Sequence, residues 1–411
     1  MTNESDERGL RCLGSEPAFP EPLHIGRPNL GDREQLFRRL NEALDRRWLT
    51  NNGQLLLEFE RELADLSGVK HAIAFANATQ GIEWLVRGLH LTGEIIVPDF
   101  TFVATAHGVL TAGCSPVLAD VDPESHLIDV ESVERLIGPD TAAIMGVHLW
   151  ALPCNVDALE EIGRRHGIPV VFDAAHAMGA THRGQPIARS GTASVYSFHA
   201  TKFVNSLEGG AVVTDDEDLA ANLRLSRNFG FAGYDNAVVL GTNGKMDEFR
   251  AAVGLGSLEA MPSIVAKNRS NWNVYDEELS FCSGLDLVLF PAGEESNYQY
   301  VVANVRPDAA LTRDEILDVL WSENIQARRY FFPGLHRMPA FADLRRAADL
   351  SGSLLASESV LVLPTGQTVG HADIRSICRV VRSALAVPSA IRAALREGKL
   401  PRHPRHTIAD R

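Results

Sequence analysis

Between residues 71 and 215 two hydrophobic patterns alternate, and this alternation constrains the fold more than any other feature of the sequence. Short apolar runs are typical of buried strands, and stretches with apolar residues at helical spacing separate them. The predicted strands are 71–76, 94–98, 116–121, 142–149, 169–174, 193–199 and 209–215, and the predicted helices between them are 79–90, 102–111, 131–137 and 156–166. Such alternation predicts an α/β fold with a mostly parallel sheet covered by helices on both faces.

The flanking regions show other patterns, which predict four parts of the chain. Residues 1–30 hold several Pro and Gly with little periodicity and are expected to form an N-terminal arm. We expect a large domain over 31–265, a smaller C-terminal α+β domain over 266–390, and a polar tail over 391–411. Within the smaller domain the patterns predict strands at 285–290, 298–305 and 325–332 and a helix at 312–324, after a long helical stretch from 247 to 279.

The charge balance excludes several classes of function. The 411 residues include 39 Lys and Arg against 53 Asp and Glu, a net charge of −14, which argues against a general nucleic-acid binder or a polybasic membrane binder. No window approaches the roughly 18 apolar residues of a membrane span, and the N-terminus lacks the apolar core of a secretory signal. The five scattered cysteines fit reduced thiols, and no HExxH or zinc-ribbon spacing predicts a metal site. We therefore expect a cytoplasmic enzyme without a metal.

In parallel sheets of this kind ligands bind at the carboxyl ends of the strands, which directs attention to Asn77, Ala78 and Thr79. These residues follow the first predicted strand and open a helix. Small residues at a helix N-terminus allow backbone N–H groups to approach a phosphate, although Thr79 could equally be an ordinary helix cap. The absence of GxGxxG here and of GxxxxGK[ST] anywhere disfavours dinucleotide and P-loop sites.

Two ionisable residues follow later strands. Asp173 ends the strand at 169–174, and a carboxylate there is costly to bury unless it meets a cation, such as a protonated pyridine nitrogen. Lys202 lies in a turn of small residues between two core strands, where desolvation would lower its pKa and make it a nucleophile for imine formation. Taken alone, Asp173 could cap a loop and Lys202 could be a solvated turn lysine.

Phe102 and Ser197 complete the set of post-strand positions. Phe102 could stack on a cofactor ring or pack in the core, and the Ser197 hydroxyl could hold a phosphate. The order matters more than any single residue: a phosphate-binding turn, an aromatic, a strand-end acid and a lysine match what pyridoxal phosphate requires.

These residues stand in longer blocks that resemble the DegT/StrS family of nucleotide-sugar aminotransferases. The resemblance runs from about residue 25 to about 385, and its strongest blocks are IIVPDFTFVATAHGVLTAGCSPVLADVDPES, PVVFDAAHAMGA and VYSFHATKFVNSLEGGAVVTDD. It implies a pyridoxal-phosphate enzyme of the aspartate-aminotransferase fold (fold type I). That fold has a mostly parallel seven-stranded sheet flanked by helices and a smaller C-terminal α+β domain.

The resemblance also assigns roles to residues. Lys202 matches the imine-forming lysine that moves the substrate proton, Asp173 the partner of the pyridine nitrogen, and His176 a position near the cofactor ring. Phe102 matches the stacking aromatic, and Ala78, Thr79 and Ser197 match phosphate contacts. The loop around Asn243 and Lys245 matches one that reaches the partner subunit's site, which implies a homodimer with shared active sites. Asn77-Ala78-Thr79 departs from the commoner Ser-Gly-Thr, and Lys245 stands where Arg is usual.

By this resemblance, L-glutamate gives its amino group to the cofactor and a nucleotide-linked ketosugar then receives it. The substrate most resembled is dTDP-4-keto-6-deoxyglucose aminated at C4, to give a 4-amino-4,6-dideoxyhexose for a natural product or polysaccharide. Amination at C3 of a dTDP-3-keto sugar remains an alternative, as do a sugar dehydratase and a non-catalytic regulator on the same scaffold. Family dehydratases carry His in place of the lysine, so Lys202 favours transamination. A nicotinamide oxidoreductase would need a Gly-rich turn that HAIAFANATQG lacks.

An acidic protein must gather local cations to bind an anionic nucleotide sugar. The candidate residues for this role are Arg227, Lys245, Arg250, Arg328 and Arg329, and Tyr330 and His336 match a segment near the site in relatives. Each of these basic residues could equally be a solvated surface charge.

Overall fold

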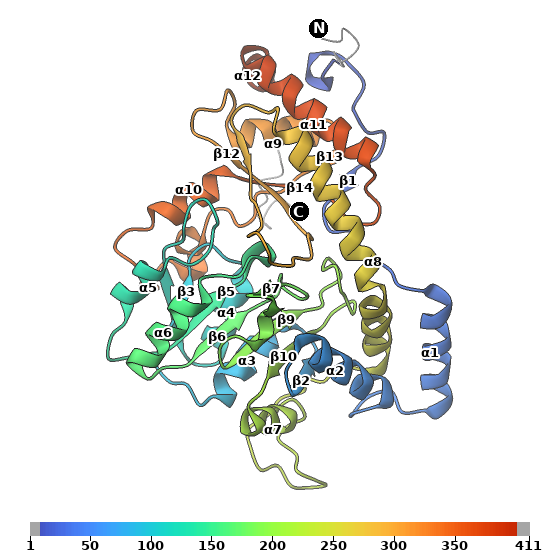
Figure 1. Cartoon of the computed structure of the whole chain (residues 1–411), viewed down its shortest axis with the longest axis vertical. Coiled ribbons are helices and arrows are strands. Elements are labelled where there is room, and N and C mark those ends of the chain that lie inside the picture. The colour runs from blue at the N-terminus through green and yellow to red at the C-terminus, as the bar shows by residue number, and fades with distance from the viewer. Residues whose placement is uncertain (1–8, 401–411) are drawn as a thin grey trace.

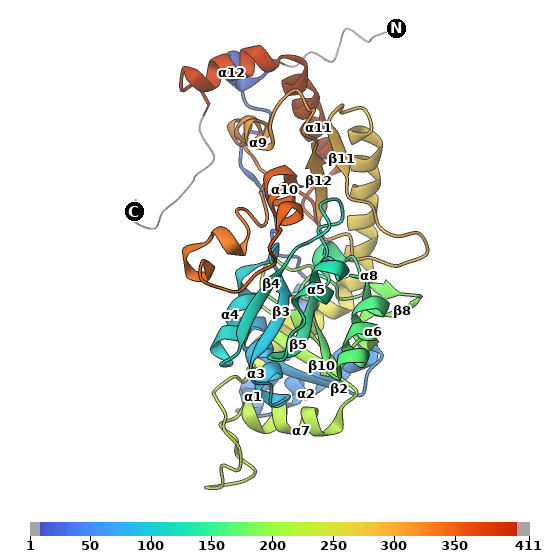
Figure 2. The same ribbon diagram turned by 90° about the vertical axis from the view of Figure 1, so that its left-hand side faces the viewer.

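The structure is a computed structural model, and it describes residues 9–400. Figure 1 shows a large sheet with its helices in the lower half of the molecule and a smaller sheet beneath α11 (His371–Ala386) in the upper half. The long helix α8 (Glu248–Leu279) runs through both halves. Figure 2, turned by 90°, shows the same two regions one above the other. Because α8 continues without a break past residue 266, the domain boundary there stays a prediction.

Seven strands form the large sheet in the order β2-β10-β9-β6-β5-β3-β4. They are β2 (His71–Phe75), β3 (Glu94–Pro98), β4 (Ser115–Ala119), β5 (Thr141–Val147), β6 (Val170–Asp173), β9 (Ala193–Ser197) and β10 (Gly210–Thr214). Within this sheet β10 is antiparallel to both neighbours, and the other pairs are parallel. The expected mostly parallel seven-stranded sheet is confirmed.

Helices cover both faces of this sheet. They are α2 (Gln54–Ser67), α3 (Ala78–Gly88), α4 (Val103–Thr111), α5 (Val130–Leu136), α6 (Val156–His166) and α7 (Glu217–Ser226). Successive residues of β10 show why the strands are apolar throughout: Val212 joins the buried cluster of α3, whereas Val213 joins that of Phe59 on α2. A strand buried on both faces has no polar side, so its sequence reads as a continuous hydrophobic run.

The smaller sheet has the order β11-β12-β14, contacts α8 and α9, and shares an apolar cluster with α11. Its elements are β11 (Leu285–Leu287), β12 (Val301–Val305), α9 (Arg313–Ser322), α10 (Ser351–Ser359), β14 (Val360–Leu363) and α12 (Pro388–Arg396). The remaining α-helix is α1 (Arg33–Arg46), and the remaining strands form two short pairs, β1 (Leu23–His24) with β13 (Ile325–Gln326) and β7 (Thr181–His182) with β8 (Gln185–Pro186).

Three expectations about the ends of the chain and the smaller domain need correction. The predicted tail at 391–411 begins inside α12, whose Ile391 is fully buried; residues 401–411 lie outside the described residues. The predicted arm is anchored, because Leu10 is buried in the same apolar cluster as Ile391 and β1 pairs with β13. The predicted strand at 325–332 ends at residue 326, and the chain then turns toward the large sheet.

No helix within 9–400 has the length and the apolar character needed to cross a bilayer. In the same range, no group of three or more His, Cys, Asp and Glu side chains is placed to hold a metal ion.

Candidate active site

A cavity of about 390 Å³ opens where the carboxyl ends of β2, β3, β6 and β9 meet. The predicted residues that line it are Ala78, Thr79, Phe102, Asp173, His176, Ser197, Lys202, Arg328 and Tyr330. They come from segments up to 252 residues apart (330 − 78), and the parallel sheet brings them together because its strands end at one edge. The convergence expected from the sequence pattern is therefore present in the fold.

The N-terminus of α3 forms one wall of the cavity. Asn77 is its N-cap, and the side chain of Asn77 accepts a hydrogen bond from Gln80 N at 2.9 Å. Thr79 is therefore not the cap, which removes the simplest structural explanation for its hydroxyl. The N–H groups of Ala78 and Thr79 belong to the first turn and have no acceptor within the helix, so they suit an anion. Gly210 lies so close that an added Cβ would come within 2.5 Å of Ala78 N.

Asp173 lies deep in the cavity and is only 5% exposed. Its Oδ2 accepts a hydrogen bond from Thr105 Oγ1 at 2.7 Å, and its Oδ1 accepts one from Ala175 N at 3.1 Å. Burial raises the pKa of Asp173, and the hydrogen bonds from Thr105 and Ala175 and the charge of Lys202 oppose that rise. Both hydrogen bonds come from neutral donors, so a cation at the cavity floor would stabilise this carboxylate further.

Lys202 follows β9 and is half-buried at the edge of the same cavity. Burial lowers its pKa from 10.5 to about 8, and the charge of Asp173 acts in the opposite direction. At pH 7 roughly a tenth of this lysine is therefore the neutral, nucleophilic amine, far more than in a lysine of ordinary pKa. The other titratable groups that line the cavity are His176, His199, Glu208, Tyr300, Arg328 and Tyr330.

A tyrosine that the sequence analysis did not select contacts Lys202. Lys202 Nζ donates a hydrogen bond to Tyr300 Oη at 3.1 Å, and Tyr300 Oη lies 3.2 Å from His176 Nε2. On the far side of the imidazole ring, Trp150 N donates to His176 Nδ1 at 3.3 Å. Burial lowers the pKa of His176 well below its ordinary value, which keeps the ring neutral.

Phe102 is 56% exposed although it is aromatic, and its side chain lines the cavity. Its ring lies 5.9 Å from the ring of Phe331 in a tilted arrangement. This exposure is inconsistent with the alternative that Phe102 is simply a core residue. A flat ring at the mouth of a cavity is suited to stacking on a planar ligand.

Several predicted residues do not reach this cavity within the same chain. Lys245 Nζ donates to Asn228 Oδ1 at 3.0 Å, and Asn243 forms a bridge with Asn228. Arg250 Nε lies 3.6 Å from Asp247 Oδ2 at the start of α8, and His336 Nδ1 lies 2.7 Å from Oδ2 of the buried Asp99. Arg329 pairs with Asp314 at 3.2 Å and stacks on Phe332.

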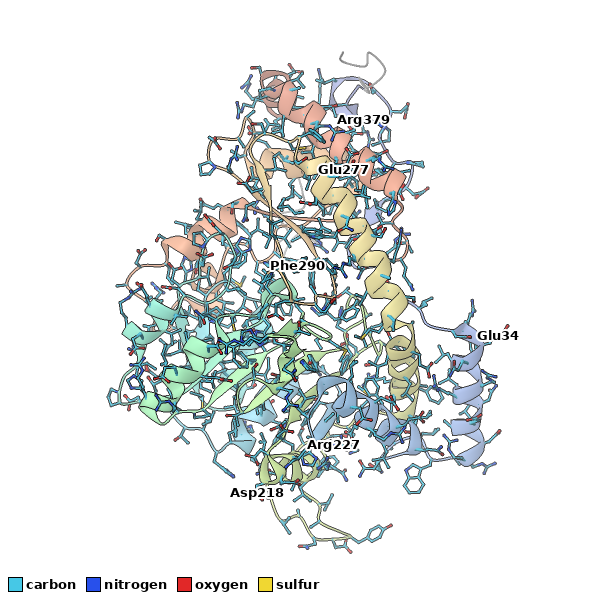
Figure 3. All side chains as sticks on the ribbon, in the orientation of Figure 1. Glu34, Asp218, Arg227, Glu277, Phe290 and Arg379 are labelled. Carbon is cyan, nitrogen blue, oxygen red and sulfur yellow. The ribbon has the colours of Figure 1, made fainter. Side chains whose placement is uncertain are left out.

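Arg227 needs a clear correction as a candidate substrate residue. Its side chain is 2% exposed and pairs with Glu60 between α2 and α7, where Figure 3 labels it. It also donates to Ala74 O and to Asn52 Oδ1, each at 2.9 Å. An arginine that is 2% exposed and held by three internal partners cannot reach a diphosphate, so its role is structural.

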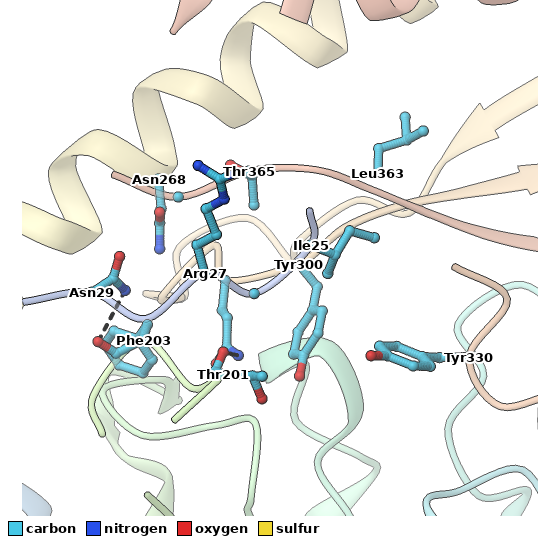
Figure 4. A pocket seen from close by; sticks show the side chains of 13 residues that line it. Ile25, Arg27, Asn29, Thr201, Phe203, Asn268, Tyr300, Tyr330, Leu363 and Thr365 are labelled. Atoms are coloured by element: carbon cyan, nitrogen blue, oxygen red, sulfur yellow. Dashed lines mark hydrogen bonds between the residues drawn. The ribbon is translucent and has the colours of Figure 1, made fainter. Parts of the chain in front are cut away.

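A second, smaller cavity of about 30 Å³ adjoins the first and shares Thr201, Tyr300 and Tyr330 with it. Figure 4 shows the hydroxyl end of Tyr300 near Thr201, while Arg27 from the N-terminal segment extends away from it toward Thr365. The expected N-terminal arm therefore contributes to the surroundings of the site.

The residues that sequence reasoning missed are Thr105, Trp150, Tyr300 and Phe331. Tyr300 directly precedes β12 of the smaller sheet, far from the strand ends that guided the search. Thr105 lies three residues beyond the predicted Phe102, within the same block of resemblance, so its position in the sequence was a signal that could have found it.

Comparison with known proteins gives a consistent result. A dTDP-4-amino-4,6-dideoxy-D-glucose transaminase of Shigella dysenteriae is 34% identical over 357 residues, which cover 87% of this chain and 96% of that protein. A GDP-perosamine synthase of Caulobacter vibrioides is 33% identical over 371 residues, covering 88% and 98%. The crystal structure of DesI in the presence of its TDP-sugar product matches with a TM-score of 0.88 and 41% identity, covering 97% of this chain and 99% of that one.

The solved structures confirm the expected fold, that of fold type I aminotransferases. A family model describing the DegT/DnrJ/EryC1/StrS aminotransferases matches residues 31–382, which include every cavity residue predicted from the sequence. The chain belongs to the DegT/DnrJ/EryC1/StrS aminotransferase family.

Proposed function

We propose that this chain uses pyridoxal phosphate to transfer an amino group from L-glutamate to C4 of dTDP-4-keto-6-deoxyglucose, giving a dTDP-4-amino-4,6-dideoxyhexose. One observation carries the proposal: an amine of lowered pKa, Lys202, and a buried carboxylate, Asp173, face the same cavity beside a helix N-terminus. Few reactions need all three features together, and transamination with this cofactor is one that does.

The residues fit the cofactor on the geometry of this chain. The N–H groups of Ala78 and Thr79 and the hydroxyl of Ser197 would hold the phosphate, and the missing side chain of Gly210 lets β10 approach the backbone of Ala78 at the start of α3. Asp173 would hold a protonated ring nitrogen, and Phe102 would cover the ring. When bound, pyridoxal phosphate supplies a carbonyl that carries the amino group and a ring that delocalises the electrons released at the substrate carbon.

The protein residues then have distinct tasks. Lys202 as a neutral amine can take a proton from the substrate carbon and return it elsewhere. Asp173 keeps a positive charge on the ring nitrogen, and the surrounding burial strengthens that attraction. Arg328 is exposed at the cavity and can attract the anionic nucleotide sugar.

The choice of sugar rests on the named relatives, since the one from Shigella dysenteriae is a dTDP-4-amino-4,6-dideoxy-D-glucose transaminase. The test is incubation with L-glutamate and a panel of dTDP-4-keto, dTDP-3-keto and GDP-4-keto 6-deoxy sugars, with the product identified by NMR. We expect an amine at C4 of the dTDP-4-keto sugar. Amination at C3 alone, or loss of the C3 hydroxyl without amination, would contradict the assignment.

Replacing Phe102 with alanine should weaken cofactor binding by roughly twofold to twelvefold, since stacking contributes about 0.5–1.5 kcal/mol. The fold should tolerate the change because the ring is 56% exposed. The measurement is a titration of the cofactor-free protein with pyridoxal phosphate. Phe281→Ala, which removes a 74% exposed ring at the end of α8, is the control. Equal affinities in the two variants would exclude the stacking role.

The lowered pKa of Lys202 predicts how cofactor capture depends on pH. The neutral amine is the reactive form, so the capture rate should rise with pH and level off above about 8 rather than near 10.5. The charge of Asp173 raises the pKa of Lys202, so Asp173→Asn should move this levelling to lower pH. Stopped-flow absorbance after mixing with pyridoxal phosphate measures the rate. A capture rate that still rises at pH 10 would show that the pKa of Lys202 is that of an ordinary lysine.

We further propose that two copies of the chain form a homodimer with shared sites. Figure 1 shows α1 at the outer edge of the molecule, beside α8. Of the 14 residues of α1, only Ala43 is buried, although the helix carries Leu36, Phe37, Leu40 and Leu44. Further exposed apolar side chains are Trp48 and Leu49 after α1, Leu57 on α2, and Phe229, Phe231 and Leu240 in the segment after α7. Such a concentration of exposed apolar surface is typical of a protein interface, and the second copy would receive Asn243 and Lys245.

Mixing two defective variants tests the shared site. Lys202→Ala and the double variant Asn243→Ala with Lys245→Ala should each have low turnover alone. After joint refolding, heterodimers with one intact site should restore about a quarter of wild-type turnover. Mass measurement by light scattering checks the dimer, and co-refolded Lys202→Ala with Asp173→Asn, which damage the same site, is the control. If heterodimers form but turnover does not recover, the two copies do not share residues in one active site.

A further inference from the structure

Hydrogen bonds connect Trp150 N, His176 and Tyr300 to Lys202, and the first two have a fixed direction of donation. Trp150 N can only donate, so His176 Nδ1 must accept, and the single proton of the neutral ring is left on Nε2. His176 Nε2 therefore donates to Tyr300 Oη across 3.2 Å. The tyrosine oxygen is thus always an acceptor toward His176, whatever happens at Lys202.

The surroundings of Trp150 hold that direction in place. Its backbone has φ of 59°, a left-handed conformation that non-glycine residues seldom adopt without support from the structure around them. The indole N–H donates to His126 Nδ1 at 2.9 Å, and His126 Nε2 lies 2.8 Å from Asn304 Oδ1. The indole ring is also stacked on Phe331, with ring centroids 5.7 Å apart and planes 3° apart.

In this series of hydrogen bonds, the group that can still change its orientation is the Tyr300 hydroxyl. It has two acceptor lone pairs and one proton. One lone pair accepts from His176 and the other accepts from Lys202 while the lysine is an ammonium. Once Lys202 loses its proton, the same hydroxyl can turn its own proton to the amine lone pair without losing the bond from His176. Burial raises the pKa of Tyr300, so the hydroxyl keeps its proton throughout.

We propose that Tyr300 is a positioning residue that holds Nζ of Lys202 in both protonation states, with its own orientation set by Trp150 through His176. This rests on the proposed function, in which Lys202 moves a proton between substrate atoms. Without the hydroxyl the four-carbon stem of Lys202 leaves its amine free to occupy several rotamers. Proton transfer requires a defined position, so the reaction slows while substrate binding does not change.

Tyr300→Phe in the cofactor-loaded enzyme is the direct test, with Tyr298→Phe as the matched control. Tyr298 lies two residues away and packs on Trp272 and Phe290, outside the cavity. The measurement is the single-turnover rate of the spectral change caused by L-glutamate. We expect Tyr300→Phe to lower the limiting rate roughly tenfold to hundredfold, with the half-saturating glutamate concentration within about twofold of wild type. Tyr298→Phe should match wild type in both.

Two outcomes overturn the proposal while leaving the proposed function intact. One is a Tyr300→Phe rate equal to that of Tyr298→Phe. The other is a change confined to the half-saturating concentration or the unfolding midpoint, which is what a merely structural role would produce. If wild type itself shows no spectral change with any amino donor, the proposed function fails and this proposal fails with it.

A second pair of variants changes His176, which donates to the Tyr300 hydroxyl. This test remains possible even if Tyr300→Phe does not fold. His176→Gln keeps an N–H donor that can reach Tyr300 Oη and should retain the limiting rate within a few-fold. His176→Leu removes the donor and should lower the rate roughly tenfold. Equal limiting rates in the two His176 variants would overturn the proposal.

Discussion

Lys202→Ala should abolish the visible absorption band of the lysine-bound cofactor and lower turnover by roughly 10⁴-fold. The reason is that one amine performs two tasks: it attaches the cofactor and it moves the substrate proton. Among residues 9–400, no other lysine lines the cavity, so the same chain offers no second amine to replace it. Absorbance spectra and steady-state assays with L-glutamate and a ketosugar measure the two effects separately.

Lys70→Ala is the matched control for this prediction. Lys70 is exposed and forms only a surface ion pair with Glu217 at 3.8 Å, so its removal should change neither the spectrum nor turnover. A Lys202→Ala protein that keeps both the band and wild-type turnover would show that another residue carries the cofactor.

Asp173→Asn should lower turnover by roughly 10²- to 10³-fold, the second largest effect. The substitution keeps the size of the side chain but removes the charge that stabilises a protonated ring nitrogen. Without that charge the ring accepts electrons from the substrate carbon less readily. We expect the cofactor still to bind, since Ala78, Thr79, Ser197 and Lys202 remain, so the loss should appear in the limiting rate of the glutamate half-reaction.

Thr105→Val separates the effect of the Asp173 charge from that of the hydrogen bond that Thr105 donates to Asp173. It removes the hydroxyl that donates to Asp173 Oδ2 at 2.7 Å but leaves the carboxylate in place. A loss of only a few-fold is expected, because the attraction between carboxylate and ring nitrogen persists. If Thr105→Val were as damaging as Asp173→Asn, the hydrogen-bonded arrangement rather than the charge would be the essential feature.

The large sheet and the main parts of the site could be predicted from the sequence for one physical reason. Strands buried on both faces are apolar throughout, so β2, β3 and β6 are recognisable within one or two residues of their ends. Because their carboxyl ends meet at one edge, the residues that follow them, such as Asp173 and Phe102, must lie close together.

What could not be predicted depends on contacts between distant segments. Tyr300 reaches the site through packing of the smaller sheet region on the large one, and no local pattern records that packing. Trp150 lies in the turn after β5 of the large sheet, and its contact with His176 depends on the left-handed backbone of that turn. The helix α12 was missed because its burial depends on partners elsewhere in the chain. Arg227 was a reasonable candidate by charge alone, but its partner Glu60 lies 167 residues away.

The most direct test of the account is the pair of half-reactions observed one after the other on the purified protein. L-glutamate alone should convert the visible absorption band into one in the near ultraviolet, with one equivalent of 2-oxoglutarate released per site. Addition of dTDP-4-keto-6-deoxyglucose should then restore the visible band and yield one equivalent of the 4-amino sugar. A spectrum that L-glutamate leaves unchanged, in a protein that nevertheless consumes the ketosugar when supplied with NADPH, would contradict the account.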